Sequence, residues 1–443
     1  MFVKKQIILK EKGLLKKILM RANMSPFDNF DASHVISNNS IGTNAGNLIF
    51  PYSLCKTLMV DNEVAIDCIR TDKVFSQKDV DRFNAEYDCF VMPLANAFRK
   101  SFIVELNKLT NLIERLKIPC IVVGVGIQFA LDAKLDGDHV FDKDVKRFVK
   151  SVLDKSALLG LRGEITAQYL AKLGFHEDKD FSVIGCISMY MHGPKLPDIK
   201  RTNLTHESVV SFSRKPELPA HFHEFIEKCI AEFPNHYFIP QNLFDFRLLY
   251  SGIPLSMTYK GKIPPGYPQT IAHESFVQNK VRGFINVPSW LEFLKNIDFS
   301  FGSRIHGNIM PILAGTPSFI FVPDARILEL ARYHNIPHMP INDIKSDINI
   351  LDIYHKTDFN TVHTGHAERF ENYIKFLNAN GLDHIYNGKR SYDVFPFDNK
   401  IAGIEFNGPL TSVYGCKPEE QVKRRIAMMF TYAKNKIKRG LRL

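Results

Sequence analysis

Residues 298–323 impose the strongest constraint on how this chain can fold. NIDFSFGS, which ends at Ser303, predicts a short strand, and GNIMPILAG predicts a helix that ends at Gly315. TPSFIFVP, which follows, predicts a second buried strand. The order is that of a β-loop-α-β unit, so the chain is expected to contain a parallel sheet covered by helices.

Arg304 and His306 stand between the first strand and the helix of this unit. In extended backbone, side chains two residues apart point the same way. Beyond the carboxyl end of a strand and at the amino end of a helix, free N–H groups and the helix dipole attract negative charge. The arrangement predicts an anionic ligand. The alternative is a structural pair that caps the helix.

The same order of buried strand, polar loop and helix recurs along the chain. The strands expected in addition are 34–39, 87–98, 118–128, 181–190, 209–216 and 236–242, and the helices are 48–59, 165–175 and 221–233. This alternation predicts an α/β protein with two Rossmann-like domains that face each other across a cleft.

Residues 191–208 are polar and contain prolines and glycines close together, which predicts a linker. The expected divisions are therefore an N-terminal domain at 1–195, a C-terminal domain at 196–390 and an extension at 391–443. Residues 253–285 contain many turn formers and match no element clearly.

The extension is expected to hold a basic amphipathic helix. Its apolar positions at helical spacing are Val422, Ile426, Met429, Phe430, Ala433 and Ile437. Two interpretations are open. The helix contacts anionic lipids at a membrane surface, or it packs on the body with a solvated basic face.

Charge is concentrated at the two ends of the chain. Residues 1–21 carry seven Lys and Arg against one Glu, and residues 417–443 carry nine against two acids. The two ends together carry a charge of +13 and the rest of the chain carries −3, which gives the net charge of +10. This distribution argues against a nucleic-acid enzyme with a basic cleft.

The seven cysteines are scattered singly and form no C-x-x-C pair, which is typical of a reduced, cytoplasmic protein. No uninterrupted apolar run approaches the roughly 18 residues that a membrane span needs. The N-terminal run is broken by lysines too often for a signal peptide. The expected location is the cytoplasm. If the basic helix contacts lipids, the protein is expected to lie at the inner face of the membrane.

Several motifs, taken in order, resemble the polysaccharide pyruvyl transferase family. The most specific is the block from Asp298 to Pro337 with R-I-H-G at 304–307, and weaker ones are N-A-G-N (44–47), G-V-G-I-Q (124–128), L-G-L-R-G-E-I-T (159–166) and S-F-S-R (211–214). The resemblance implies a GT-B-like fold and transfer of pyruvate from phosphoenolpyruvate, as co-substrate, onto a sugar of a surface-polysaccharide precursor as a ketal. It implies no further cofactor. A lipid-linked sugar is one acceptor that would give the basic ends a purpose.

The resemblance also implies roles for particular residues. His306 and Arg304 are expected to be catalytic; Arg214, Ser303, Gly307, Asn308 and Arg326 are expected to bind the donor; Asn44, Gly46, Asn47, Gln128 and Arg162 are expected to bind the acceptor. Structural alternatives are a surface arginine for Arg214, a pair with Glu164 for Arg162, a simple turn for 44–47 and a strand-end cap for Gln128. The chain departs from the family pattern at Asn47 and near Arg326, and it has Cys186-Ile187 where many members have Asp-Pro.

Two other functions compete with pyruvyl transfer. A glycosyltransferase of similar fold could grip the diphosphate of a nucleotide sugar with the same Arg and His, and a binding protein could retain the site without the chemistry. No metal is expected, since H-E-x-x-H is absent and His221 and His223 lie on different faces of a helix. G-V-G-I-Q lacks the third glycine that a nicotinamide site requires.

Overall fold

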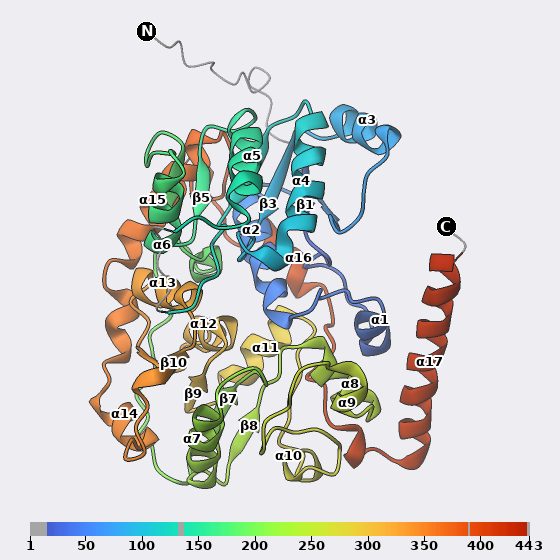
Figure 1. The fold of residues 1–443 in the computed structure, drawn as a ribbon, viewed down its shortest axis with the longest axis vertical. Helices are drawn as coiled ribbons and strands as arrows, with labels where there is room; N and C mark the ends of the chain where they lie inside the picture. Colours follow the sequence, from blue (N-terminus) through green and yellow to red (C-terminus); the bar gives the residue numbers. More distant parts are fainter. Residues whose placement is uncertain (1–15, 132–136, 389, 441–443) are drawn as a thin grey trace.

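The computed structural model describes residues 16–131, 137–388 and 390–440, and it divides into two halves that each contain a parallel sheet (Figure 1). The predicted α/β class with parallel sheets is confirmed. The segment 191–208 joins the halves without a helix or strand, as the sequence predicts.

The N-terminal half is built on a four-stranded sheet with the order β2-β1-β3-β4, in which every pair is parallel. A two-stranded parallel pair, β5-β6, continues it through a bridge between Val125 and Leu161. The strands are β1 Lys17–Arg21, β2 Ala65–Ile69, β3 Cys89–Pro93, β4 Cys120–Val123, β5 Leu159–Leu161 and β6 Phe181–Val183. The helices are α1 Ala32–Ser37, α2 Ile49–Leu58, α3 Gln77–Glu86, α4 Ile103–Arg115, α5 Asp142–Leu153 and α6 Glu164–Lys172, with 3₁₀ turns at Ala45–Leu48, Lys100–Phe102 and Ile187–Tyr190.

Both faces of this sheet are buried, because alternate side chains of each strand enter different cores. On β1, Leu19 packs with the core under α4 and α5, whereas Ile18 and Met20 pack with the core under α2. Apolar positions on α5 recur at Val145, Phe148 and Val152 and cover the first of these faces. Helices on both faces give the doubly wound arrangement.

The C-terminal half is built on a five-stranded parallel sheet with the order β11-β10-β9-β7-β8. Its strands are β7 Val210–Ser213, β8 His236–Phe238, β9 Phe299–Gly302, β10 Ser318–Val322 and β11 His338–Pro340. Its helices are α7 Ala220–Ala231, α8 Leu243–Ser251, α9 Leu255–Thr258, α10 Glu274–Val277, α11 Val287–Leu294, α12 Ile305–Leu313, α13 Ala325–Tyr333 and α14 Ile350–Lys356, with 3₁₀ turns at Ile341–Asp343 and Phe359–His363.

The two faces of this second sheet carry different side chains. Large aromatic residues such as Phe212 and Phe301 face α7, whereas small serines face α12. Ser211 on β7 donates a hydrogen bond to Ser300 on β9 (2.9 Å). Small side chains on that face allow α12 to approach the sheet closely.

The structure differs from the expected N-terminal half in two ways. Residues 34–39 were expected to be a strand, but they belong to α1 and the turn after it, because Asp31 caps the helix by accepting a hydrogen bond from the His34 N–H. The strand β1 was not among the expected elements, because a short apolar run between lysines gives little strand signal of its own. Ile18, Leu19 and Met20 are fully buried between β2 and β3.

The chain returns to the N-terminal half after β11. Asn380, just beyond α15 (His366–Ala379), accepts hydrogen bonds from the backbone N–H groups of Ala157 and Leu158 (3.0 and 3.2 Å). The Asn372 amide donates to the Val183 carbonyl of β6 (2.6 Å). Tyr373, Phe376 and Leu377 of α15 accordingly share a core with Ile184, on the face of the β5-β6 pair opposite to that covered by α5 and α6.

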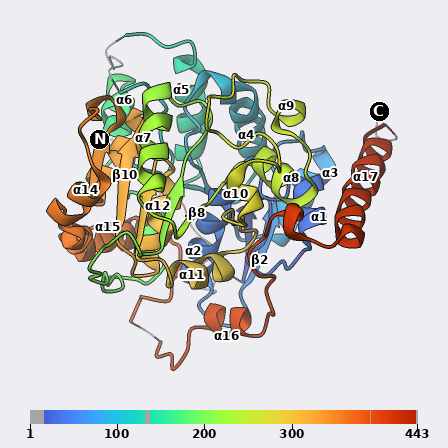
Figure 2. The same cartoon turned by 90° about the horizontal axis from the view of Figure 1, so that it is seen from below.

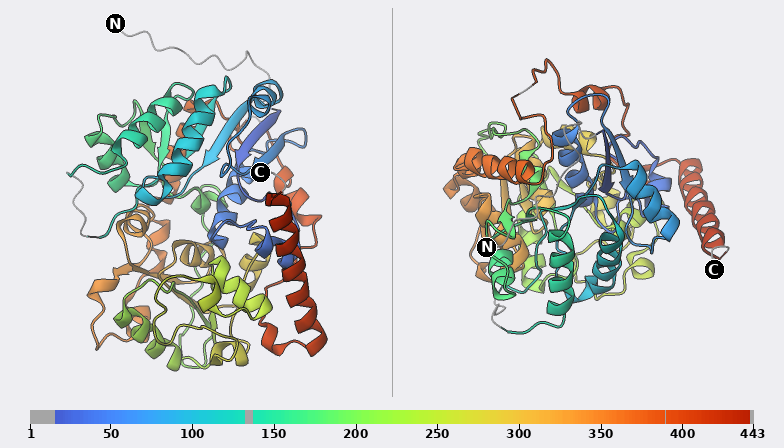
Figure 3. Two further views of the ribbon diagram at one scale, coloured as in Figure 1. Left: turned by 45° about the vertical axis from the view of Figure 1, so that its right-hand side comes forward. Right: turned by 90° about the horizontal axis from the view of Figure 1, so that it is seen from above.

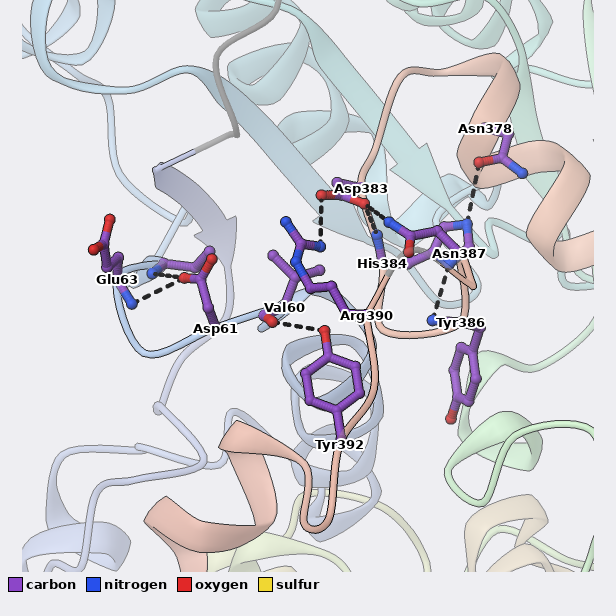
Figure 4. Close-up of polar contacts among 11 residues, drawn as sticks. Val60, Asp61, Glu63, Asn378, Asp383, His384, Tyr386, Asn387, Arg390 and Tyr392 are labelled. Carbon is purple, nitrogen blue, oxygen red and sulfur yellow. Dashed lines mark hydrogen bonds and ion pairs between the residues drawn. The ribbon is translucent and has the colours of Figure 1, made fainter.

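This return corrects the expected domain boundary, which placed residues up to 390 in the C-terminal domain. Beyond α15, the Tyr392 hydroxyl donates to the Val60 carbonyl (2.7 Å), and Arg390 forms an ion pair with Asp383 (3.0 Å) (Figure 4). Residues 366–388 and 390–392 therefore lie with the N-terminal half, whereas Leu410 and Arg425 further along contact Gly283 and Ser251 of the C-terminal half. α15 was not among the expected helices, and nothing local in its sequence says which sheet it covers.

The extension forms α16 (Pro396–Ala402), a 3₁₀ turn at Val413–Gly415 and the long α17 (Pro418–Gly440). In Figures 1 and 2, α17 stands at the outside of the molecule, next to α1 and α8. Its helical character was predicted. Among the described residues, no helix combines the length and the apolar character that crossing a membrane would require.

Candidate functional site

The turn between β9 and α12 begins at Gly302, whose backbone conformation favours glycine. Gly302 has φ +141°, and a Cβ there would lie 2.1 Å from the carbonyl oxygen of Ser213 on the neighbouring strand β7. The chain therefore leaves β9 in close contact with β7. Arg304 is the residue that precedes α12, and Ile305 begins the helix.

Arg304 projects from this turn toward the segment that follows β8. It donates a hydrogen bond to Asn242 Oδ1 (2.9 Å) and is partly exposed. Burial lowers the pKa of Arg304, but a guanidinium stays charged at neutral pH. The remaining N–H groups of the side chain are suited to an anion.

His306 is enclosed by residues of the N-terminal half. It is 8% exposed, its ring meets Phe50 of α2 edge-on (5.2 Å between centroids), and its Nε2 lies 3.9 Å from Cys186 Sγ. Burial, followed by the nearby Arg162, Arg326 and Arg304, holds the pKa of His306 well below its usual range. The imidazole is therefore neutral at pH 7.

A loop of the N-terminal half contacts the site from the other side. Asn44 accepts a hydrogen bond from the Gly46 N–H (2.7 Å), and a Cβ on Gly46 would lie only 2.4 Å from His306 Nδ1. The Ala45 N–H donates to the Gln241 carbonyl (2.8 Å), and Asn44 forms an antiparallel bridge with Asn242. The predicted acceptor loop and the predicted catalytic histidine thus lie in contact.

Buried hydrogen-bonding groups without a protein partner surround the first turn of α12. Ser213 Oγ, Ser303 Oγ and Gln241 Nε2 have none among the described residues. A Cβ on Gly307 would lie 2.6 Å from Ser213 Oγ and 2.5 Å from Gln241 Nε2, so two of these groups lie against the helix. Buried polar groups are normally paired, so this cluster at a helix amino end indicates a ligand with acceptor atoms.

Two further cations lie close to Arg304. Arg326 forms an ion pair with Asp324 (3.1 Å), which also caps α13 by accepting from the Ile327 N–H. Lys215 is near enough to Asp324, Arg326 and Arg304 for their charges to affect its pKa, which burial lowers. Arg304, Arg326 and Lys215 are thus the cations grouped around the amino end of α12, and Asp324, Glu217 and Asp245 are the acids whose charges act on them.

Arg214 was expected to grip the donor opposite Arg304. It does follow β7, the neighbour of β9, but its side chain is buried in an ion pair with Glu227 (2.7 Å) and a hydrogen bond to the Gly266 carbonyl (2.8 Å). The guanidinium also lies 5.4 Å from the ring centre of Tyr267. Arg214 thus already has partners within the protein.

Arg162 was expected either to bind the acceptor or to pair with Glu164. Its Nε donates to the Gly124 carbonyl (2.9 Å), and its guanidinium lies over the Phe50 ring (4.6 Å). No ion pair joins it to Glu164 within the described chain; the acid that raises its pKa, after Cys186, is Glu329. Burial nevertheless lowers the pKa of Arg162 to about 10.

The other predicted residues have the following places. Gln128 accepts from Asn96 (2.6 Å) and Arg99 (3.1 Å). Asn47 is exposed and donates to the Ile41 carbonyl (3.0 Å). Asn308 is fully buried, donates to the carbonyls of Gly302 (3.1 Å) and Arg304 (2.8 Å), and accepts from Ser318 (3.0 Å). Since its amide is satisfied by these bonds, Asn308 shapes the turn, and the expectation that it contacts the donor is corrected.

Sequence reasoning missed Lys215, Gln241 and Asn242. All three lie within four residues of the carboxyl end of a strand of the C-terminal sheet, where ligands of α/β proteins bind. The polar pair Gln241-Asn242 after β8 was therefore the available signal. Across residues 16–131, 137–388 and 390–440, no group of three or more His, Cys, Asp and Glu side chains is placed to hold a metal ion.

Cys186, one of the departures from the family pattern, lies at the site. Its sulfur is 3.9 Å from His306 Nε2. Cys186 is therefore one of the groups that enclose the imidazole.

Comparison with solved structures gives distant similarities. UDP-GlcNAc 2-epimerase from Methanocaldococcus jannaschii has a TM-score of 0.44 at 11% identity, over 82% of this chain and 99% of that one. Sucrose-phosphate synthase from Thermosynechococcus elongatus has a TM-score of 0.41 at 9% identity, over 82% and 97%. UDP-GlcNAc 2-epimerase from Neisseria meningitidis has a TM-score of 0.40 at 10% identity, over 82% and 100%. No curated protein matches the chain significantly.

Comparison with protein families gives a direct assignment. The family model described as polysaccharide pyruvyl transferase matches residues 44–325. The match begins at Asn44, in the loop that contacts His306, and it includes Arg304 and His306 themselves. Arg326 lies one position beyond its end. The matched range covers more than half of the chain and both halves of the site, so the chain belongs to the polysaccharide pyruvyl transferase family and is a transferase.

Proposed function

We propose that this enzyme transfers the pyruvyl group of phosphoenolpyruvate onto two hydroxyls of a sugar in a surface-polysaccharide precursor, as a ketal. The observation that carries the proposal is the group of Arg304 and neutral His306 at the amino end of α12, with unpaired buried donors around them. Such a site suits a small, highly charged anion whose reaction also requires proton transfer to or from a side chain.

Phosphoenolpyruvate has a carboxylate and a phosphate, and each can accept two parallel hydrogen bonds from a guanidinium. Arg304 is available for one of these groups, because within the described part of the chain its guanidinium donates to Asn242 alone. Lys215 and Arg326 lie close enough to neutralise the other. Ser213, Ser303 and Gln241 supply donors that the fold leaves unpaired among its described residues.

The lowered pKa of His306 makes its imidazole a proton acceptor in the free enzyme. It can accept the proton of the sugar hydroxyl that attacks C2 of the donor, and the imidazolium can supply a proton to the methylene carbon. The attack and the protonation occur together, because C2 of an enol becomes electrophilic only as the methylene carbon is protonated to the methyl group. Phosphate then leaves from C2, the second hydroxyl attacks C2 and completes the ketal, and the departing phosphate takes up the proton that this hydroxyl releases.

The acceptor side of this proposal rests on the loop that contains Asn44, Gly46 and Asn47. This loop lies against His306, and Asn47 is exposed. We expect a sugar hydroxyl to enter between the loop and the imidazole. We propose that this hydroxyl belongs to a lipid-linked sugar at the cytoplasmic side of a membrane.

Ligand-dependent thermal unfolding tests the proposal. The purified protein is titrated with phosphoenolpyruvate and, separately, with a panel of nucleotide sugars, and Arg304→Ala, His306→Ala and Arg82→Ala are compared. Arg82, half-exposed on α3, is the matched control. A ligand at 100 times its Kd stabilises the fold by about 2.7 kcal/mol.

Stabilisation by phosphoenolpyruvate that Arg304→Ala abolishes and Arg82→Ala retains would support the proposal. Release of phosphate on addition of sugar acceptors, lost in His306→Ala, would support the ketal chemistry. Stabilisation by a nucleotide sugar alone would refute it and leave a glycosyltransferase. A protein that binds phosphoenolpyruvate but releases no phosphate with any acceptor would be a binding protein.

A further inference from the structure

Helix α17 exposes an apolar stripe to solvent. Val422, Ile426, Met429 and Phe430 are between 46% and 73% exposed. Their spacing of four, seven and eight residues from Val422 places them on one face of the helix, and the exposed Ala433 continues it. Single exposed apolar residues need no explanation, but a continuous row of this kind marks an interaction surface.

The helix is fixed to the body by a different face. Met428 is buried and accepts from the Ser37 hydroxyl (3.4 Å) of α1. Arg424 lies over the Tyr250 ring (5.1 Å), and Arg425 donates to the Ser251 carbonyl at the end of α8 (3.2 Å). On a helical projection, Arg424 and Met428 lie opposite the stripe.

These contacts bear on the two interpretations that the sequence left open: the helix does pack on the body, but by its other face. Packing of the predicted apolar face on the body is wrong, because that face points outward. In Figure 3, α17 runs along the edge of the molecule, and in Figure 2 it stands clear of both sheets. The stripe is therefore accessible without any change in the fold.

Basic residues accompany the stripe. Lys423, next to it on the helix, has a side chain that is 80% exposed. Residues 417–443 carry nine Lys and Arg, while the two acids, Glu419 and Glu420, both lie in the first turn of the helix. An apolar face bordered by cations is the pattern of a helix that lies in the plane of a membrane interface.

We propose that α17 binds the surface of an anionic lipid bilayer, with Met429 and Phe430 inserted among the acyl chains and the neighbouring basic residues in contact with the headgroups. This surface goes beyond the pyruvyl transfer reaction and does not rest on it. Each basic residue near an anionic surface strengthens binding, and salt weakens it. A second copy of the chain fits less well, because a symmetric contact would bring the same cations together.

Vesicle co-sedimentation of the full-length protein tests the proposal. The vesicles contain either phosphatidylcholine alone or phosphatidylcholine with about one third phosphatidylglycerol, a composition chosen to supply the negative charge that the basic residues require. The stripe variant is Met429→Glu/Phe430→Glu. The control is Met257→Glu, where a methionine of similar exposure (77% against 70% for Met429) lies on a different helix, α9.

We expect wild type and Met257→Glu to bind the anionic vesicles, with weaker binding as salt increases, and the stripe variant to lose at least tenfold in affinity. Circular dichroism and thermal unfolding of each variant show whether the fold is retained. Three results would overturn the proposal: no binding of wild type to anionic vesicles, equal binding to neutral vesicles, or an equal loss in Met257→Glu. A dimer in analytical ultracentrifugation that the stripe variant abolishes would assign the face to a second copy instead.

Discussion

Gly46→Ala should damage catalysis through a single added methyl group. The new Cβ would stand 2.4 Å from His306 Nδ1, whereas ordinary contact begins near 3.4 Å, so the ring must retreat by about 1.0 Å. Phe50 and Cys186 limit that retreat. A displacement of about 1 Å in a catalytic group costs on the order of 10²-fold in rate.

Stability should change much less than activity. Overpacking costs about 1–3 kcal/mol, and replacing a glycine at a position without positive φ returns about 0.4–1 kcal/mol through the unfolded state. We therefore expect a net loss of about 1–2 kcal/mol in urea unfolding. The backbone of Gly46 is not in the left-handed region, so backbone strain does not contribute.

The assay is phosphate release from phosphoenolpyruvate in the presence of a sugar acceptor, with kcat and KM determined separately. The control is Gly408→Ala, where a Cβ meets no atom within 4 Å and φ is not positive. We expect kcat to fall about 100-fold in Gly46→Ala and to stay near wild type in Gly408→Ala. Wild-type kcat in Gly46→Ala would show that the position of the His306 ring does not control the reaction.

Three further predictions follow from the same geometry. Arg304→Lys should raise the KM for phosphoenolpyruvate at least tenfold in steady-state kinetics, because an ammonium cannot replace a bidentate guanidinium; an unchanged KM would exclude Arg304 from donor binding. Cys186→Asp places a carboxylate beside His306 and raises the pKa of the imidazole, so the acidic limb of the kcat/KM profile should move to higher pH, whereas in Cys186→Ser it should not. Burial raises the pKa of Glu329 from 4.5 to about 7, so the folded form holds a proton that the unfolded form loses, and wild-type stability should fall as the pH rises from about 4.5 to about 7. Glu329→Gln should remove this slope in urea unfolding and gain at most about 3 kcal/mol above pH 7; an unchanged slope would contradict the shift.

The sequence predicts the elements of the C-terminal sheet more completely than those of the N-terminal one. β7 and β9 alternate phenylalanine with serine, and β10 is a run of four apolar residues after Ser318, so each strand can be identified from its own residues. β1 is a short apolar run inside a basic segment, and its strand character comes from pairing with β2 and β3. Which sheet α15 packs against depends on tertiary contacts, and the spacing of apolar residues along the helix does not predict them.

The candidate site divides in the same way. Arg304 and His306 could be predicted because a strand, a turn and a helix amino end are adjacent in sequence. Arg214 could be placed at the correct strand end, but its ion pair with Glu227 depends on how α7 packs. The contact of Gly46 with His306 joins residues that are 260 positions apart, and only the folded chain brings them together.

The neutral state of His306 is a property of both halves of the molecule. The ring comes from α12, but much of the burial that lowers its pKa comes from Gly46, Phe50 and Cys186. If the halves separated, water would reach the imidazole and its pKa would return toward its usual value, so a larger fraction would be protonated below pH 7.

The bridge between the halves also positions the arginine. Asn242 pairs with Asn44 through its backbone and accepts a hydrogen bond from Arg304 through its side chain. Separation of the halves would therefore release Arg304 and expose His306 together. The anion-binding group and the proton acceptor form a single unit whose assembly depends on this contact, which explains why residues distant in sequence must meet before the site is complete.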